Sequence, residues 1–105
     1  MKTATIIVAA INTADIEQIK KCLTSINTER FEVMVVCPTK YHKNIKEVLE
    51  KMSNFSTTPC DQTSIRGLWR QGEESAITPW IVFIESSDIL TAQLQKNIDQ
   101  ECGKF

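Results

Sequence analysis

The sequence contains little histidine and no closely spaced cysteines. It has one histidine in 105 residues, and none of its four cysteines belongs to a CxxC pair. A zinc site, which draws on clusters of these two residue types, is therefore not expected. A disulfide framework is not expected either, because Cys22 and Cys102 lie inside apolar helical patterns. We interpret all four cysteines as small buried side chains of a protein from a reducing, cytoplasmic compartment.

The chain also lacks an excess of charge of either sign and any long hydrophobic run. Its 12 basic and 13 acidic residues give a net charge of −1. This balance gives no electrostatic reason to expect a nucleic acid or an anionic membrane as partner. The apolar stretch near the N-terminus ends before Asn12 and is too short for a secretion signal or a membrane span. The motifs GxGxxG and GxxxxGK(S/T) are absent, so their phosphate-binding loops are not expected.

What the sequence does contain is an alternation of apolar strand-like runs and amphipathic helical segments. Its length predicts a single domain over residues 1–105. Strands are predicted over 5–10, 31–37 and 80–85, with a weak edge strand at 57–60. Helices are predicted over 16–26, 39–52, 64–76 and 91–102. The alternation predicts an α/β fold: a three-layer α/β/α, Rossmann-like parallel sheet with three to four strands and four helices.

The apolar pattern also predicts how these elements pack. The three apolar strands should be mutually parallel, with the first strand of the chain between the second and the last, because they are continuously apolar and joined by helical crossovers. Leu23 and Ile26 should face the sheet from the first helix. Leu94 and Ile98, one turn apart, should form the apolar side of the last helix.

The ends of the predicted strands are the places to search for a site. In open parallel sheets, ligands bind beyond the carboxyl ends of the strands, where the strand order reverses. Here those ends are residues 9–12, 37–40 and 85–88. Asn12 or Thr13 can cap the first expected helix, and Thr39 can cap the second. Backbone N–H groups at the helix starts near Asn12 and Thr39 can hold phosphate oxygens.

Three segments of the chain, taken in order, match one family. The first strand reads TIIVAAIN and leads to a helix with the stretch CLTSI at 22–26. The second strand reads FEVMVVC, and the last reads WIVFIESSDIL after a helix that contains two glycines. With this order and spacing the sequence resembles the N-terminal, nucleotide-binding half of the inverting, family 2-like GT-A glycosyltransferases. The resemblance spans about residues 4–95, which is nearly the whole chain.

The resemblance implies a ligand, a cofactor and a set of contact residues. The ligand would be a nucleotide-sugar, and the cofactor a divalent metal, manganese or magnesium, that neutralises the diphosphate. The nucleotide contacts would be Asn12, Cys37 and Thr39. The metal contacts would be Glu85 and Asp88.

The sequence departs from the family where the chemistry should take place. Cys37 and Pro38 stand where the family has aspartates that hold the nucleotide. Ser87 takes the second acidic position of the Asp-x-Asp motif, with Asp88 one residue later. An alternative interpretation of this segment has no metal: Asp88 caps the last helix, and Glu85 is a solvated charge at the strand end.

Two functions therefore stay open. One is a glycosyltransferase-like module that binds a sugar nucleotide; the other is a non-catalytic α/β domain that binds a nucleotide or a partner protein. In the family, a second half follows the metal motif and supplies the base that deprotonates the acceptor hydroxyl. We therefore expect the 105-residue chain on its own to transfer no sugar, whether it is a fragment of a longer enzyme or a stand-alone half domain.

Overall fold

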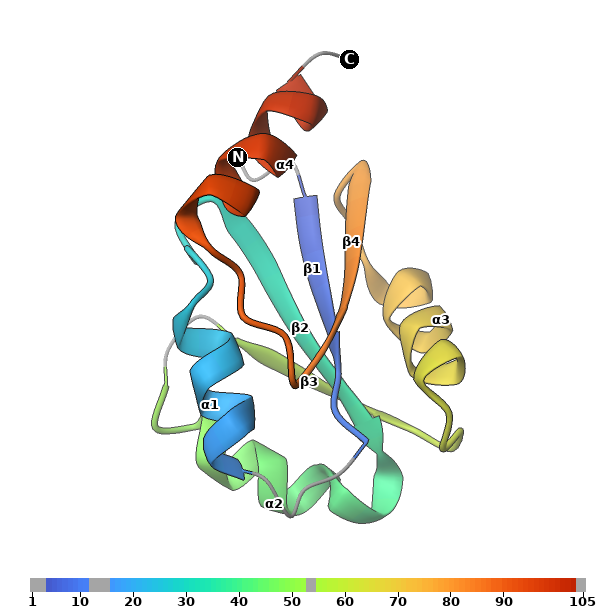
Figure 1. Ribbon diagram of the computed structural model, residues 1–105. Coiled ribbons are helices and arrows are strands. Elements are labelled where there is room, and N and C mark those ends of the chain that lie inside the picture. Colours follow the sequence, from blue (N-terminus) through green and yellow to red (C-terminus); the bar gives the residue numbers. More distant parts are fainter. Residues whose placement is uncertain (1–3, 12–15, 53–54, 104–105) are drawn as a thin grey trace.

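The computed structural model describes residues 4–11, 16–52 and 55–103, except the side chains of 102 and 103. Strands and helices alternate along these residues (Figure 1). The strands are β1 (Ala4–Ala9), β2 (Phe31–Pro38), β3 (Ser56–Cys60) and β4 (Trp80–Glu85). The helices are α1 (Ile16–Thr24), α2 (Thr39–Leu49), α3 (Ile65–Ser75) and α4 (Ala92–Gly103). The predicted α/β fold is confirmed, and the weak edge strand is present as β3.

The strands form one parallel sheet in the order β3-β2-β1-β4. β1 lies inside the sheet because its residues are almost all apolar, and each of them is buried. Its first residue, Ala4, pairs with Phe31 of β2 on one side and with Trp80 of β4 on the other. The predicted arrangement, with the first strand between the second and the last, is therefore confirmed.

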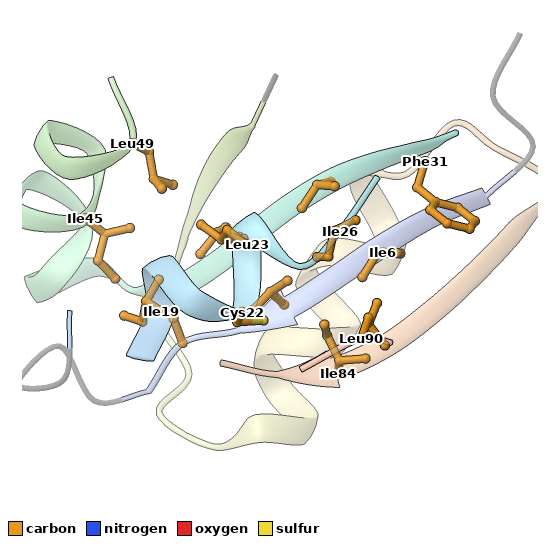
Figure 2. Packing of buried hydrophobic residues seen from close by; sticks show 14 of the residues in the cluster. Ile6, Ile19, Cys22, Leu23, Ile26, Phe31, Ile45, Leu49, Ile84 and Leu90 are labelled. Carbon is orange, nitrogen blue, oxygen red and sulfur yellow. The ribbon is translucent and has the colours of Figure 1, made fainter. Parts of the chain in front are cut away.

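Helices α1 and α2 cover one face of the sheet, and α3 covers the other (Figure 1). On the first face, Ile19, Cys22 and Leu23 project from α1 toward the sheet, as Figure 2 shows. Leu23 is 0% exposed, and Ile26, which lies two residues past the end of α1, is 6% exposed, so both residues are buried as predicted. The apolar residues of α1 therefore join α2, β1 and β2 in one core.

The second face is covered by α3, whose Leu68 is completely buried against the sheet. A glycine brings this helix close to the strands. A Cβ atom added at Gly72 would lie 2.6 Å from Cγ2 of Ile7 and 3.1 Å from Cγ2 of Val36, closer than packed atoms approach. The glycine therefore allows α3 to pack tightly on β1 and β2, at the cost of some helix propensity.

The helix starts agree only in part with the sequence-based expectations. α3 begins as expected, because the Oγ of Ser64 accepts a hydrogen bond from the Gly67 N–H at 3.1 Å. Thr39 was expected to cap α2, and this was wrong. β2 runs directly into α2, so Pro38 occupies the N-cap position and Thr39 is already the first helical residue. The expected cap of α1, Asn12 or Thr13, lies outside the described residues.

The last helix, α4, packs through a polar residue rather than through Leu94. Leu94 is 44% exposed, so its predicted place on the inner side of the helix was wrong, whereas the neighbouring Gln95 is 7% exposed. Gln95 Oε1 accepts from the Asn27 N–H at 2.7 Å. Its Nε2 donates to the carbonyl oxygens of Ser25 at 2.6 Å and Leu90 at 2.9 Å. The first two bonds attach α4 to the loop before β2, near the amino end of the sheet (Figure 1), and the third holds the segment that leads into α4.

The expectation that the cysteines are buried is confirmed for the three whose side chains the structure describes. Cys22, Cys37 and Cys60 are buried and not bonded to one another as disulfides. Among the described residues, no helix has the length and the apolar composition needed to cross a membrane.

Candidate functional site

The carboxyl edge of the sheet is where the predicted site residues should meet. β2 and β3 lie on one side of β1 and β4 lies on the other, so the strand order reverses beside β1. Ligands of open parallel sheets bind at the carboxyl ends of the strands at such a reversal. Neighbouring strands are about 4.8 Å apart, which places the ends of β2 and β4 about 10 Å from each other. Groups at these two ends can therefore contact one ligand.

The turn that follows β4 carries the two predicted metal contacts, Glu85 and Asp88. The Asp88 N–H donates to the Glu85 carbonyl oxygen at 3.0 Å, and the Glu85 N–H donates to Asp88 Oδ2 at 2.8 Å. Asp88 therefore folds back onto the strand and does not cap α4. The cap is Thr91, whose Oγ1 accepts from the Leu94 N–H at 3.1 Å. The structure thus holds two carboxylate-bearing residues on one closed turn.

The CLTSI stretch of the first helix contacts this turn and the loop behind it. The Cys22 thiol donates to the Glu85 carbonyl oxygen, with a sulfur–oxygen distance of 3.8 Å. The Ser25 Oγ accepts from the Leu90 N–H at 3.1 Å. Two of the segments that carried the family resemblance, far apart in sequence, therefore lie side by side. Their contacts give a physical reason for a cysteine and a serine in that stretch.

The environment of Cys22 keeps its thiol protonated. Burial, and to a smaller extent the nearby carboxylate of Asp88, raises the pKa of Cys22 to about 11. A protonated thiol can donate its hydrogen to the strand end. One turn earlier in α1, the Gln18 side chain donates to the Ser87 carbonyl oxygen at 3.3 Å. The acidic turn is therefore fixed from the α1 side by neutral hydrogen-bond donors.

The predicted nucleotide contacts at the end of β2 differ in exposure. Burial, and to a smaller extent the thiol of Cys60, raises the pKa of Cys37 to about 11, and the Cys37 side chain is 0% exposed. The whole of Cys37 is thus closed off in this arrangement, and its contact with a nucleotide stays a prediction. Thr39 is exposed at the start of α2. Asn12 lies outside the described residues, so its role stays a prediction.

The structure adds a carboxylate that sequence reasoning missed. Asp61 follows β3 directly and accepts a hydrogen bond from the Thr39 Oγ1 at 3.0 Å. The two residues meet because β2 and β3 are paired in register, with Pro38 beside Cys60. The signal in the sequence is the weak edge strand itself. Asp61 follows its carboxyl end directly, at the same kind of place as the candidates that follow the other strands.

The acidic residues fit a divalent cation only in one way. Among the described residues, no group of three or more His, Cys, Asp or Glu side chains is close enough to hold a metal ion. Magnesium, however, is usually bound by one or two carboxylates together with substrate phosphates and waters. Glu85 and Asp88 can supply two carboxylates, although Asp88 Oδ2 already accepts the Glu85 N–H. Two carboxylates are the number that a cation of this substrate-borne kind uses.

A separate cleft has a volume of about 770 Å³. It is bounded by α4 and the loop before β2, and Arg30, Gln95 and Asp99 are among its lining residues. Gln95 uses its side chain to dock α4, and Arg30 forms an ion pair with Asp99. These three side chains are thus engaged in holding the helix, so the candidate site remains at the carboxyl edge.

No family model matches the chain, and no curated protein matches it significantly. Among solved structures, eleven chains match significantly. One is the crystal structure of S. aureus TarS 1–349, with a TM-score of 0.72 and 20% sequence identity. The alignment covers 99% of this chain.

TarS is a family 2-like GT-A glycosyltransferase. The fold is shared. The structural neighbour thus confirms the family resemblance drawn from the sequence at the level of the fold, over nearly all of the present chain. The chain spans 33% of the length of the TarS chain, and at 20% identity the likeness carries no information about individual site residues.

Proposed function

We propose that this chain is a glycosyltransferase-like module that binds a nucleotide-sugar at the carboxyl edge of its sheet. The observation that carries the proposal is the closed acidic turn of Glu85 and Asp88. It lies beside the central strand where the strand order reverses, in a fold shared with a GT-A glycosyltransferase. A turn of this kind at that point is suited to a cation bound to a diphosphate.

The nucleoside end of the ligand would lie toward β2 and β3. The carboxylate of Asp61 can accept hydrogen bonds from ribose hydroxyls, and the Thr39 hydroxyl next to it is exposed. The first N–H groups of α2 have no acceptor within the helix and favour an anion, so they would face the phosphates. The chain's own residues thus bind and orient the ligand along the edge from β3 to β4.

The diphosphate end would lie at the turn after β4. Magnesium or manganese, when bound there with Glu85 and Asp88, would neutralise the negative charge of the diphosphate. The Glu85 N–H holds one oxygen of the Asp88 carboxylate, so that group keeps its position without a ligand. Support from α1, through the Cys22 thiol, limits movement of the turn.

We further propose that the chain binds without transferring the sugar. The position of the family's nucleotide-binding aspartates is taken by the buried Cys37. In the acidic turn, the Glu85 N–H already binds one oxygen of the Asp88 carboxylate, and it does not engage the carboxylate of Glu85. Binding should therefore be weak, with a dissociation constant on the order of 1 mM. The buried, protonated thiols suit a reducing compartment such as the cytoplasm.

The proposal can be tested by titrating the ¹⁵N-labelled chain with uridine diphosphate and magnesium. We expect amide shifts to concentrate at residues 37–41, 61–62 and 85–88, and trace manganese to broaden the last group selectively. Glu85→Gln should abolish the broadening, and Asp61→Asn should reduce only the nucleotide-induced shifts. Glu73→Gln, an exposed change on α3, is the matched control and should alter neither.

Two results would contradict the proposal. Shifts that are absent, or scattered away from the carboxyl edge at millimolar nucleotide, would remove the binding site. Sugar transfer or donor hydrolysis by the isolated chain that is lost in Glu85→Gln would show that the module is an enzyme, against the second part of the proposal.

A further inference from the structure

The two edges of the sheet differ in how they are protected. β3 ends one side with the sequence STTPC, which is short, polar and contains Pro59. β4 ends the other side with WIVFIE, in which five successive residues are apolar. Phe83 is 42% exposed and Trp80 is 37% exposed. Natural proteins protect exposed sheet edges with proline, charge or short length, and β4 uses none of these between Trp80 and Ile84.

The register of β4 determines which of its backbone groups face the open edge. Ile84 pairs with Val8 of β1, and the Ser86 N–H donates to the Ala9 carbonyl oxygen at 3.1 Å. In a parallel ladder this directs the even-numbered residues of β4 toward β1. The odd-numbered residues, Ile81 and Phe83 among them, therefore direct their N–H and C=O groups away from β1. Within the described residues, no strand pairs with that side.

Both ends of this open edge are blocked. At the carboxyl end, the outward N–H of Glu85 is already bound by Asp88 Oδ2 at 2.8 Å. At the amino end stands Pro79, which has no N–H to donate. The groups left for pairing are those of Ile81 and Phe83, and they lie symmetrically about Val82. An edge with this symmetry is complementary to itself when two strands run in opposite directions.

We propose that two copies of this chain associate through antiparallel pairing of their β4 strands about a two-fold axis at Val82. Ile81 of each copy lies opposite Phe83 of the other, and each of these pairs exchanges two backbone hydrogen bonds. The blocked carboxyl end of each β4 strand then faces the blocked amino end of the other, because Glu85 lies opposite the second copy's Pro79. The two sheets become one continuous sheet, and the dimer is closed.

The side chains along the open edge of β4 favour a second copy of the chain as the partner that covers it. On the α3 face of the sheet, Phe83 contacts Trp69 with ring centroids 5.4 Å apart. The two-fold axis would place Ile81 of the second copy beside this pair, so apolar surface covers apolar surface. No charged side chain stands between Trp80 and Ile84, and the net charge of −1 gives little repulsion between copies. The inference does not rest on nucleotide binding.

Sedimentation equilibrium of the full chain, from about 5 to 300 µM, tests the proposal. We expect a monomer–dimer equilibrium with a dissociation constant on the order of 10–100 µM. Phe83→Lys places a charge at the centre of the interface and should weaken association by about 10-fold or more. Leu94→Lys makes the same kind of change on α4 at a matched exposure, 44% against 42%, and should leave association unchanged.

Cross-linking tests the register directly and does not depend on how Phe83→Lys folds. Residues on the two-fold axis form a non-hydrogen-bonded pair with Cα atoms about 4.5 Å apart, within the range of a disulfide. Val82→Cys should therefore form a covalent dimer under mild oxidation, above the level of the unaltered chain, whereas the exposed Ile89→Cys should not. A monomer at all concentrations, open-ended oligomers, or equal cross-linking of both variants would overturn the proposal.

Discussion

Replacing Gln95 by leucine should separate α4 from the rest of the domain. Leucine keeps most of the side-chain volume and the helix propensity, but it removes three hydrogen bonds. The Asn27 N–H and the carbonyl oxygens of Ser25 and Leu90 then lose their partner in a region that is largely buried. An unsatisfied buried group costs about 1–3 kcal/mol, and water can reach some of these groups. We therefore expect the free energy of unfolding to fall by about 2–4 kcal/mol.

Urea denaturation followed by circular dichroism measures this change. For a domain of this size, a loss of 2–4 kcal/mol corresponds to a decrease in Tm on the order of 10–20 °C. Gln100→Leu, an exposed change on the same helix, is the matched control and should stay within about 0.5 kcal/mol of the unaltered chain. Amide hydrogen exchange should show lost protection in α4 before the sheet opens.

The reasoning would be refuted if Gln95→Leu and Gln100→Leu had the same small effect. That result would mean that the three hydrogen bonds exchange with water at no net cost. A large loss of stability with unchanged protection in α4 would also count against it, because the loss would then come from somewhere other than the docking of this helix.

Three further changes follow from the packing and the thiols. Leu23→Ala should lower the free energy of unfolding by about 2–5 kcal/mol, since Leu23 is fully buried, and a loss under 1 kcal/mol in urea melts would contradict its assigned place. Gly72→Ala should destabilise by about 1–3 kcal/mol despite the better helix propensity of alanine, because the new methyl group would press on Ile7, and a stabilised variant would show that α3 can shift freely. Cys22 and Cys37 have pKa values raised from 9.0 to about 11, so stability should be constant below pH 8 and fall between about pH 9 and 11, as the unfolded chain loses protons that the folded chain keeps. Pulse labelling with a thiol reagent at pH 8 checks the same point, since both thiols should react only on unfolding.

The sheet was predictable because each strand can be recognised from the apolar residues of its own segment. Three strands are continuously apolar, and helical crossovers between such strands lead to a parallel sheet. The helix faces followed from apolar spacing wherever apolar contacts decide the packing, as at Leu23. At α4 the prediction holds for Ile98, which packs against the core, and fails for Leu94. The buried neighbour is Gln95, held by hydrogen bonds to distant backbone groups, and no periodicity in the sequence marks such a partner.

The sequence predicted where the candidate site lies, but not how its residues contact one another. Glu85 and Asp88 were placed at a strand end from the sequence alone, but the bond from the Glu85 N–H to Asp88 depends on the shape of the turn. Thr39 was wrongly expected to cap α2 because β2 continues into α2 without a loop, a fact that appears only in three dimensions. Asp61 was missed because its contact with Thr39 depends on the register of an edge strand with little apolar character.

The order of the strands has a consequence for how the chain folds during synthesis. β1 is made first, yet one of its two neighbours is β4, and the paired residues Ala4 and Trp80 are 76 positions apart. At about 5–20 residues per second, a ribosome needs roughly 4–15 s to make that distance. During this interval one edge of the most apolar strand has no partner, and contacts between such distant residues also form slowly. A nascent chain of this protein should therefore be most prone to aggregation, and most in need of a chaperone, until β4 has left the ribosome.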